Sequence, residues 1–310
     1  MTEAAPTVYP WPMGEAKSED AEARVARLTC WRGRVTPEPL SGGLSNRNFL
    51  VRDGDRRCVV RLGEDVPVHG LVRRNEVACS RAAAAAGLSP ALVHVEPGVL
   101  VFDFVDGRTL TAEDVRGDAM LARIVAIVQR CHREMPQQLS GAPPLFWVFH
   151  ALRDYARTLL QGNSRMVDEL PLLMDAAERL ERAVGPIELK FAHNDLLAAN
   201  FIEDGERLWL IDWEYGGFNS PLFDLGNLAS NNGLSPAQVE WLLATYDGRS
   251  PSPARRRSLA AMTCASLLRE AMWSMVQEIH SALPIDYVAY TTENLARYEA
   301  AWAEFAKADA

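Results

Sequence analysis

Short apolar segments separated by turn signals occupy most of the first hundred residues. Asp53–Gly54 is a hairpin signal between two such segments, and an alanine run that ends at Gly87 is typical of a helix and its end. A Gly-rich stretch interrupts the first strand-like segments, giving the order strand, Gly-rich turn, strand, turn, strand. The pattern predicts helices at residues 17–31 and 72–86, and strands near residue 40 and at residues 49–51, 58–62, 93–95 and 99–102.

After about residue 105 the apolar positions recur mainly with helical spacing. Helices are expected at residues 118–133 and 149–161, and from residue 236 to the end. One strand-like island interrupts them, with a strand at residues 187–192 and a hairpin of residues 200–202 and 208–211. The change of pattern near residues 103–107 predicts an α+β protein with two lobes. We expect residues 1–104 to form the first lobe, with residues 1–16 as a tail, and residues 105–310 to form the second.

The island carries the strongest chemical signal in the chain. Asp195 follows a predicted strand, where a loop can direct its carboxylate toward a substrate hydroxyl. Asn200 lies five residues later, and the predicted hairpin returns Asp212 to its side. Amide and carboxylate oxygens suit Mg²⁺, which is usually held by one or two protein groups together with phosphates and waters. A base beside such a pair is what phosphoryl transfer requires, because its catalysis consists mainly of positioning and charge neutralisation.

The pattern HxDxxxxN at residues 193–200, followed by IDWE at residues 211–214, resembles the kinase-like phosphotransferases. This superfamily includes the aminoglycoside phosphotransferases and the choline/ethanolamine kinases. His-Asn-Asp and Ile-Asp-Trp-Glu-Tyr look like the choline kinase branch, and the similarity covers about residues 40–300. The resemblance implies a protein-kinase-like fold with an antiparallel sheet lobe, a mainly helical second lobe, and ATP and Mg²⁺ as cofactors. It implies three roles for five residues: Asp195 is the base, His193 orients the loop, and Asn200, Asp212 and Glu214 lie at the metal.

The Gly-rich stretch is similar to the nucleotide loop of the same family. Two glycines allow backbone N–H groups to approach phosphates closely, and neighbouring side chains can add donors. A plain hairpin turn is the competing interpretation, which the position before two strands weakens. The residues expected to contact the nucleotide here are Ser41, Gly42, Gly43, Ser45 and Asn46.

Arg61 matches the position of the nucleotide-binding lysine of protein kinases, and its planar fork suits phosphate. Glu76, on the next predicted helix, is expected to pair with Arg61, although Arg73 or Arg74 could pair with it locally. Phe102 and Phe104 fall in the expected hinge whose backbone meets adenine; their apolar character fits plain core as well.

The C-terminal helices resemble the part of choline kinases that holds the acceptor. Trp273 and Tyr290 match aromatic residues that surround a cationic group through cation–π attraction, although a tryptophan on an apolar helix is also typical of core. Glu270 stands where the eukaryotic family has a second tryptophan, and Asn231 and Asn232 stand near a missing glutamate. We therefore expect Glu270 to supply the cation-binding carboxylate, which would suit a smaller or less methylated amine. Asp224 is expected to cap or brace the loop that carries Asp195.

The amino-acid composition argues against nucleic acid and membranes as partners of this protein. Asp plus Glu number 41 and Lys plus Arg number 32, so the formal net charge is −9. A broad nucleic-acid surface would need excess positive charge. No run approaches the roughly 18 apolar residues of a membrane span, and the N-terminus does not resemble a signal peptide. Five scattered cysteines without a CxxC pair favour a reduced, cytoplasmic compartment.

The sequence therefore predicts an ATP-dependent kinase acting on a small cationic alcohol, with choline or ethanolamine as the leading substrates. An aminoglycoside-type or other small-molecule kinase is the alternative in the same fold. A catalytically inactive nucleotide-binding protein is a further alternative, against which the retained set of Arg61, Asp195, Asn200 and Asp212 argues. The oligomeric state stays open, with a homodimer among the options.

Overall fold

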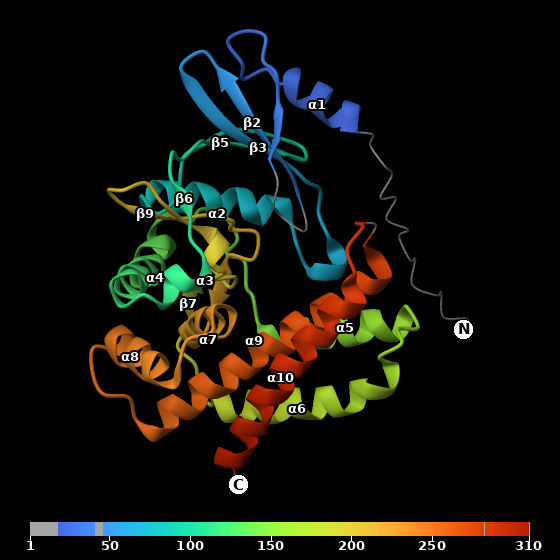
Figure 1. Cartoon of the computed structure of the whole chain (residues 1–310), viewed down its shortest axis with the longest axis vertical. Helices are drawn as coiled ribbons and strands as arrows, with labels where there is room; N and C mark the ends of the chain where they lie inside the picture. The colour runs from blue at the N-terminus through green and yellow to red at the C-terminus, as the bar shows by residue number, and fades with distance from the viewer. Residues whose placement is uncertain (1–17, 41–45, 282, 310) are drawn as a thin grey trace.

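The computed structural model of the chain describes residues 18–40, 46–281 and 283–309 (Figure 1). Four residues of the expected nucleotide loop, Ser41, Gly42, Gly43 and Ser45, lie outside these ranges. The expected tail at residues 1–16 lies outside them as well. Within the described part of the chain, no helix is long and apolar enough to cross a lipid bilayer.

The N-terminal part contains a five-stranded antiparallel sheet in the order β1-β2-β3-β5-β4. Its hairpins turn at Gly54 and Gly98, which have φ values of 63° and 69°, a conformation that glycine adopts without strain. The sequence prediction of these strands is confirmed to within a few residues. The strands are β1 (Glu38–Leu40), β2 (Arg47–Asp53), β3 (Arg56–Leu62), β4 (Leu92–Glu96) and β5 (Val99–Asp103).

The two faces of this sheet pack against different parts of the molecule. Cys58, Val60 and Leu62 of β3 are buried in one hydrophobic cluster with side chains of helix α1 (Ser18–Ala26). Because successive side chains of a strand point to opposite faces, Arg61 lies on the other face. That face is turned toward helix α2 (Arg73–Ala85) and the rest of the molecule. The alternation along β3 therefore decides which way Arg61 points.

Helix α1 ends earlier than the sequence predicted. The expected helix reached residue 31, but α1 ends at Ala26. The indole Nε1 of Trp31 donates a hydrogen bond to the carbonyl of Val25 at 2.8 Å, so the chain folds back over the end of the helix. This local hydrogen bond replaces a further helical turn.

The second part is mainly helical, and the long helix α9 runs through it (Figure 1). It packs against α5, α6, α7 and α10, and nearly all of its residues from 261 to 277 are buried. Helix α7 was not predicted, since helices were expected to resume only near residue 236. The helices are α3 (Ala112–Arg116), α4 (Asp118–Gln138), α5 (Val148–Gln161), α6 (Leu170–Val184), α7 (Pro221–Asn232), α8 (Pro236–Asp247), α9 (Pro253–His280) and α10 (Tyr287–Asp309).

Two small sheets hold the predicted island. One has the order β6-β8-β9, with β6 (Arg108–Thr109), β8 (Phe201–Glu203) and β9 (Leu208–Leu210), and the other pairs β7 (Lys190–Ala192) with β10 (Gly217–Asn219). Asn200 was expected on a strand, but it ends a short 3₁₀ turn, Ala198–Asn200, just before β8. The turn is closed by the Asn200 amide, which donates to the carbonyl of Asp195 at 2.8 Å. This contact draws both residues into one loop.

Candidate active site

The loop of residues 193–200 is fixed by a buried carboxylate. Asp224, on helix α7, is fully buried and accepts hydrogen bonds from the backbone N–H groups of His193 and Asn194 at 2.9 and 2.7 Å. His132 Nε2 lies 2.9 Å from the same carboxylate. Burial would raise the pKa of Asp224, but the hydrogen bond and charge of His132 hold it below its usual value. The expected bracing role of Asp224 is therefore present in the structure.

Asn194 takes a left-handed backbone conformation with φ of 66°, which few residues other than glycine and asparagine adopt readily. Its side-chain amide donates to the carbonyl of Tyr215 at 2.9 Å and accepts from Asn219 at 2.8 Å. The position between His193 and Asp195 thus requires a residue that tolerates positive φ. Asparagine meets this requirement, because it enters the left-handed region more readily than most other residues.

Asp195 lies at the bend of this loop with its side chain 16% exposed. Burial raises the pKa of its carboxyl to about 7, against the opposing charge of Arg269. A carboxyl group titrating near neutrality can accept a proton from a substrate hydroxyl and release it again. The environment of Asp195 therefore fits a general base.

His193 connects the loop to the segment that carries Asp212. Its Nε2 lies 2.8 Å from the carbonyl of Ile211, and its ring packs edge-on against Trp213 at 4.7 Å between centroids. The ring is fully buried, and burial lowers its pKa, so the imidazole is neutral near pH 7. These contacts suit an orienting residue better than a proton carrier.

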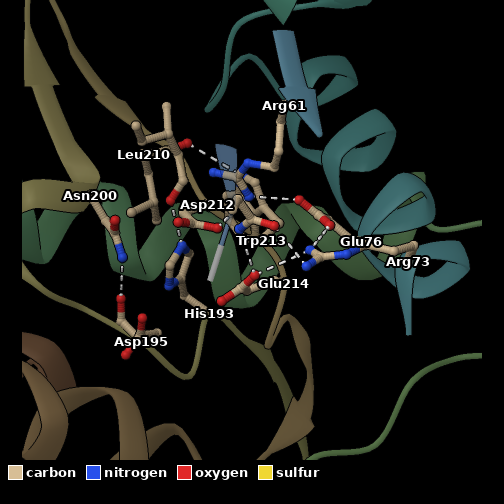
Figure 2. Close-up of polar contacts among 12 residues, drawn as sticks. Arg61, Arg73, Glu76, His193, Asp195, Asn200, Leu210, Asp212, Trp213 and Glu214 are labelled. Atoms are coloured by element: carbon tan, nitrogen blue, oxygen red, sulfur yellow. Dashed lines mark hydrogen bonds and ion pairs between the residues drawn. The ribbon is translucent and has the colours of Figure 1, made fainter. Parts of the chain in front are cut away.

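A network of charged side chains joins the sheet to the IDWE segment (Figure 2). Arg61 Nη1 lies 2.7 Å from Glu76 and 2.6 Å from Asp212, and Arg73 Nη1 lies 2.6 Å from Glu76 and 3.2 Å from Glu214. The ion pair predicted between Arg61 and Glu76 is confirmed. Arg73, the local alternative, is a second partner of the same carboxylate. Glu76 is 1% exposed, so the two guanidinium groups compensate a buried charge.

The surroundings of Asp212 and Glu214 shift the pKa values of these two carboxyl groups in opposite directions. Burial would raise the pKa of Asp212, but Arg61, together with other nearby groups such as Arg73, lowers it below its usual value. Burial and the nearby Asp212 raise the pKa of Glu214. Asp212 has a φ of 69°, a left-handed conformation that is sparsely populated and often found at functional sites.

Three further residues predicted to contact the nucleotide, Asn46, Phe102 and Phe104, lie in different surroundings. Asn46, the described end of the Gly-rich stretch, donates to Glu214 at 3.1 Å and accepts from Arg73 at 2.7 Å. This brings the end of that stretch against the charged network. Phe102 lies within β5, and the N–H of Phe104 donates to the carbonyl of Arg57 at 3.0 Å.

Asn200 and Asp212 offer oxygen atoms of the kind that bind Mg²⁺. Because the Asn200 amide nitrogen is used by the Asp195 carbonyl, the amide oxygen is directed away from that contact. Asp212 adds a carboxylate that is 26% exposed, with one oxygen at Arg61. Among the described residues, no group of three or more His, Cys, Asp or Glu side chains is arranged to hold a metal ion by itself. A hard cation that takes one or two protein oxygens and completes its shell with phosphates and waters fits this donor set.

A second cluster, which we call the α9–α10 cluster, comprises Arg269, Glu270, Trp273, Tyr287 and Tyr290. Trp273 lies 6.4 Å from Tyr290 and 6.3 Å from Tyr287 between ring centroids, both edge-on. The Tyr290 hydroxyl donates to Glu270 at 2.8 Å. The structure therefore brings together the three residues predicted to hold the acceptor.

Two members of this region were missed by the sequence analysis. Arg269 lies 3.6 Å from Asp195 and joins the α9–α10 cluster to the 193–200 loop. His69 is buried, with Nε2 3.1 Å from Gln277 and its ring 5.3 Å from Trp273. A charge inside the apolar run of α9 could have drawn attention to Arg269. Nothing in the sequence near His69 indicates its contact with a helix two hundred residues away.

Space for a ligand adjoins this region. A cavity of about 490 Å³ lies between the turn at residues 67–70, the segment at residues 144–147, helix α5 and residues 214–216. His69, Tyr155 and Tyr215 are among the residues that line it. The cavity thus reaches side chains that border both the charged network and the α9–α10 cluster.

Comparison with known proteins agrees with this geometry. Residues 38–237 match the family model described as choline/ethanolamine kinase. The chain is 29% identical over 299 residues to ethanolamine kinase 2 of Mus musculus, covering 86% of this chain and 76% of that protein. It is 27% identical over 258 residues to protein LicA of Haemophilus influenzae, covering 79% and 75%.

A solved structure extends the comparison to the whole fold. The crystal structure of a choline/ethanolamine kinase family protein from Mesorhizobium loti has a TM-score of 0.73 and 28% identity, and the match covers 94% of this chain and 97% of that one. The family match spans well over half of the chain and includes the sheet, the 193–200 loop and the IDWE segment. The chain therefore belongs to the choline/ethanolamine kinase family, and it is a small-molecule kinase with an alcohol group as acceptor.

Proposed function

We propose that this kinase transfers the γ-phosphoryl group of ATP to the hydroxyl of a small amino alcohol, with choline or ethanolamine as the substrate. The observation that carries the proposal is the position of Asp195. Its carboxyl, with a pKa raised to about 7, lies between the charged network around Arg61 and the α9–α10 cluster. The names of the relatives, ethanolamine kinase 2 among them, support the same substrate class.

In this proposal Asp195 accepts the proton of the substrate hydroxyl as its oxygen attacks the γ-phosphorus. His193 holds the loop through Ile211, and Asn194 and Asp224 fix the backbone on which Asp195 is carried. Positioning of this kind is the main catalytic contribution of the protein in phosphoryl transfer.

The nucleotide is proposed to lie between residues 1–104 and residues 105–310. Arg61 would bind its phosphates, with Glu76 holding the guanidinium in place. The backbone and side chains of Ser41, Gly42, Gly43, Ser45 and Asn46 would contact the phosphates as well. The strand end at Phe102 and Phe104 would meet the adenine ring.

Asn200 and Asp212 are the residues that would hold Mg²⁺, with Glu214 nearby. When bound, the cation neutralises the charge of the transferred phosphoryl group. The mixture of one amide and two carboxylates supports a site completed by phosphate oxygens.

The acceptor is proposed to bind at Glu270, Trp273 and Tyr290. Glu270 supplies a carboxylate that is 20% exposed and therefore reachable by a cation. The acidic charge of the protein favours the approach of such a substrate. Four of the five cysteines are buried and all five are unpaired, which supports a reduced, cytoplasmic location.

The test is a panel of alcohols and amino alcohols incubated with ATP and Mg²⁺, with ADP release as the readout. Choline or ethanolamine should give turnover that disappears in the Asp195→Asn variant. Asp175→Asn, at an exposed position of α6, is the matched control and should retain full activity. Turnover that survives in the Asp195→Asn variant would contradict the proposed mechanism, and turnover only with alcohols lacking an amine would contradict the proposed substrate.

A further inference from the structure

Arg269 is a buried cation inside the proposed acceptor site. It is 2% exposed, and its Nη1 lies 3.6 Å from Asp195 and 3.7 Å from Glu270. Its Nε is buried without a hydrogen-bond partner among the described residues. A buried guanidinium stays charged, and the surrounding acids and tyrosines raise its pKa further despite desolvation. The site therefore contains a fixed positive charge of its own.

This guanidinium covers an aromatic face that a cationic ligand could otherwise use. The central carbon of Arg269 lies 4.2 Å from the ring centroid of Tyr215 and 5.9 Å from that of Phe146. Both distances are within the range of a cation–π contact. The protein's own cation thus occupies the face of Tyr215.

The ring of Trp273 is surrounded in a similar way. His69 lies 5.3 Å away at an interplanar angle of 31°, and Tyr287 and Tyr290 approach edge-on. A trimethylammonium group has no N–H to donate and depends on open aromatic faces for its binding. The aromatic side chains here face other residues of the protein, so such a group finds few open faces.

Hydrogen-bond acceptors, in contrast, are available. One oxygen of Glu270 accepts from Tyr290 at 2.8 Å, while the other lies 3.7 Å from Arg269, beyond hydrogen-bond distance. Asp195 and Glu270 place two carboxyl groups beside the single guanidinium of Arg269. A singly charged ammonium group that donates N–H bonds would complement both the charge and the hydrogen bonding of Arg269, Asp195 and Glu270.

We propose that Arg269 is a specificity-determining residue that selects amino alcohols whose nitrogen carries N–H, and disfavours quaternary ammonium alcohols. The inference rests on the proposed function and narrows its substrate class. The guanidinium fills the aromatic face at Tyr215, and the carboxylate oxygen of Glu270 then becomes the main partner of the acceptor nitrogen. Each added methyl group removes a donor and competes with Arg269 for space.

The first test is a series of acceptors with zero to three methyl groups: ethanolamine, its N-methyl and N,N-dimethyl derivatives, and choline. With saturating ATP and Mg²⁺, we expect kcat/KM to fall along the series, by about tenfold or more between ethanolamine and choline. Choline turned over as well as ethanolamine, or better, overturns the inference and leaves the proposed function intact. Absence of turnover with all four acceptors contradicts the proposed function itself.

The second test replaces the cation. Arg269→Leu should uncover the Tyr215 ring and raise the choline-to-ethanolamine ratio of kcat/KM by about tenfold, mainly through KM. Arg269→Lys, which keeps the charge, should retain most of the wild-type preference. Arg256→Leu, at a surface ion pair on the same helix, is the control and should leave the ratio unchanged. An equal loss with all four acceptors in the Arg269→Leu variant would indicate a purely structural role and overturn the inference. If the Arg269→Leu variant does not fold, the kcat/KM values of the wild-type protein with the four acceptors decide whether the inference holds.

Discussion

The substitution Asp224→Asn tests whether a buried carboxylate holds the 193–200 loop. Asp224 accepts two backbone hydrogen bonds, from His193 and Asn194, and a third from His132. Asparagine keeps the size but replaces one oxygen by a donor, so at least one buried N–H loses its acceptor. An unsatisfied buried donor costs about 1–3 kcal/mol, and loss of the charge weakens the remaining bonds. We expect the free energy of unfolding to fall by about 3 kcal/mol.

Urea unfolding followed by tryptophan fluorescence measures this loss. Activity should fall as well, because displacement of the loop by a fraction of an ångström misplaces Asp195; we expect kcat to drop by about 10- to 100-fold. Asp175→Asn, an exposed position on α6, is the matched control and should change the free energy of unfolding by less than about 0.5 kcal/mol.

The same substitution has a defined pH dependence. The pKa of Asp224 is lower in the folded protein than in the unfolded chain, so its contribution is fully present above the unfolded value of about 3.9. It is lost as the pH falls through the folded pKa. The difference between wild type and Asp224→Asn should therefore be constant from pH 5 to 7 and shrink below about pH 4. Unfolding free energies that are equal for the two proteins at pH 7 would refute the bracing role.

Three further predictions concern the chemistry. The rate constant kcat/KM should fall on the acid side with an inflection near pH 7, because the pKa of Asp195 is raised to about 7 and a base must be ionised to act; a profile flat from pH 5.5 to 8 would exclude this group. Arg61→Met should raise KM for ATP by about tenfold or more, whereas Arg61→Lys should recover part of the affinity, as measured by nucleotide titration of ADP release. Glu270→Gln should raise KM for amino alcohols by about tenfold with kcat less affected, and an unchanged KM for every amino alcohol would show that this carboxylate does not bind the acceptor.

Short apolar segments separated by turn signals predicted the N-terminal strands well, because glycines such as Gly54 and Gly98 mark the hairpins that join them. In the structure Cys58, Val60 and Leu62 are the buried positions of β3, and this alternation places Arg61 on the opposite face. The motif around Asp195 correctly predicted one proximity: the N–H of Ile211 donates to the carbonyl of Asn200 at 2.9 Å, which brings the Asp212 segment beside Asn200. Element ends were less predictable. Trp31 and Asn200 changed the limits of their elements through single side-chain hydrogen bonds, which periodicity does not contain.

Contacts between residues far apart in the sequence could not be predicted from any local pattern. Helix α7 was missed, although its residue Asp224 was expected to brace the loop. His69 and Gln277 are 208 positions apart, and Arg61 and Asp212 are 151 apart. Only the packing of helices against one another and against the sheet brings these pairs together, and each pair changes the charge or hydrogen bonding of the site.

The sequence by itself determined the strands of the first part, the mainly helical second part and the resemblance to the choline/ethanolamine kinases. The elements follow from local periodicity and turn signals, and the resemblance follows from the residue types and spacing at residues 193–200 and 211–214. Only the tertiary structure decided the surroundings and the pKa values of the proposed site residues. The pKa of Asp195 depends on its burial and on Arg269, and the faces open to an acceptor depend on which side chains already cover Tyr215 and Trp273. Burial and proximity are properties of the packed chain, because desolvation and Coulomb energies depend on distances in space and not on positions in sequence.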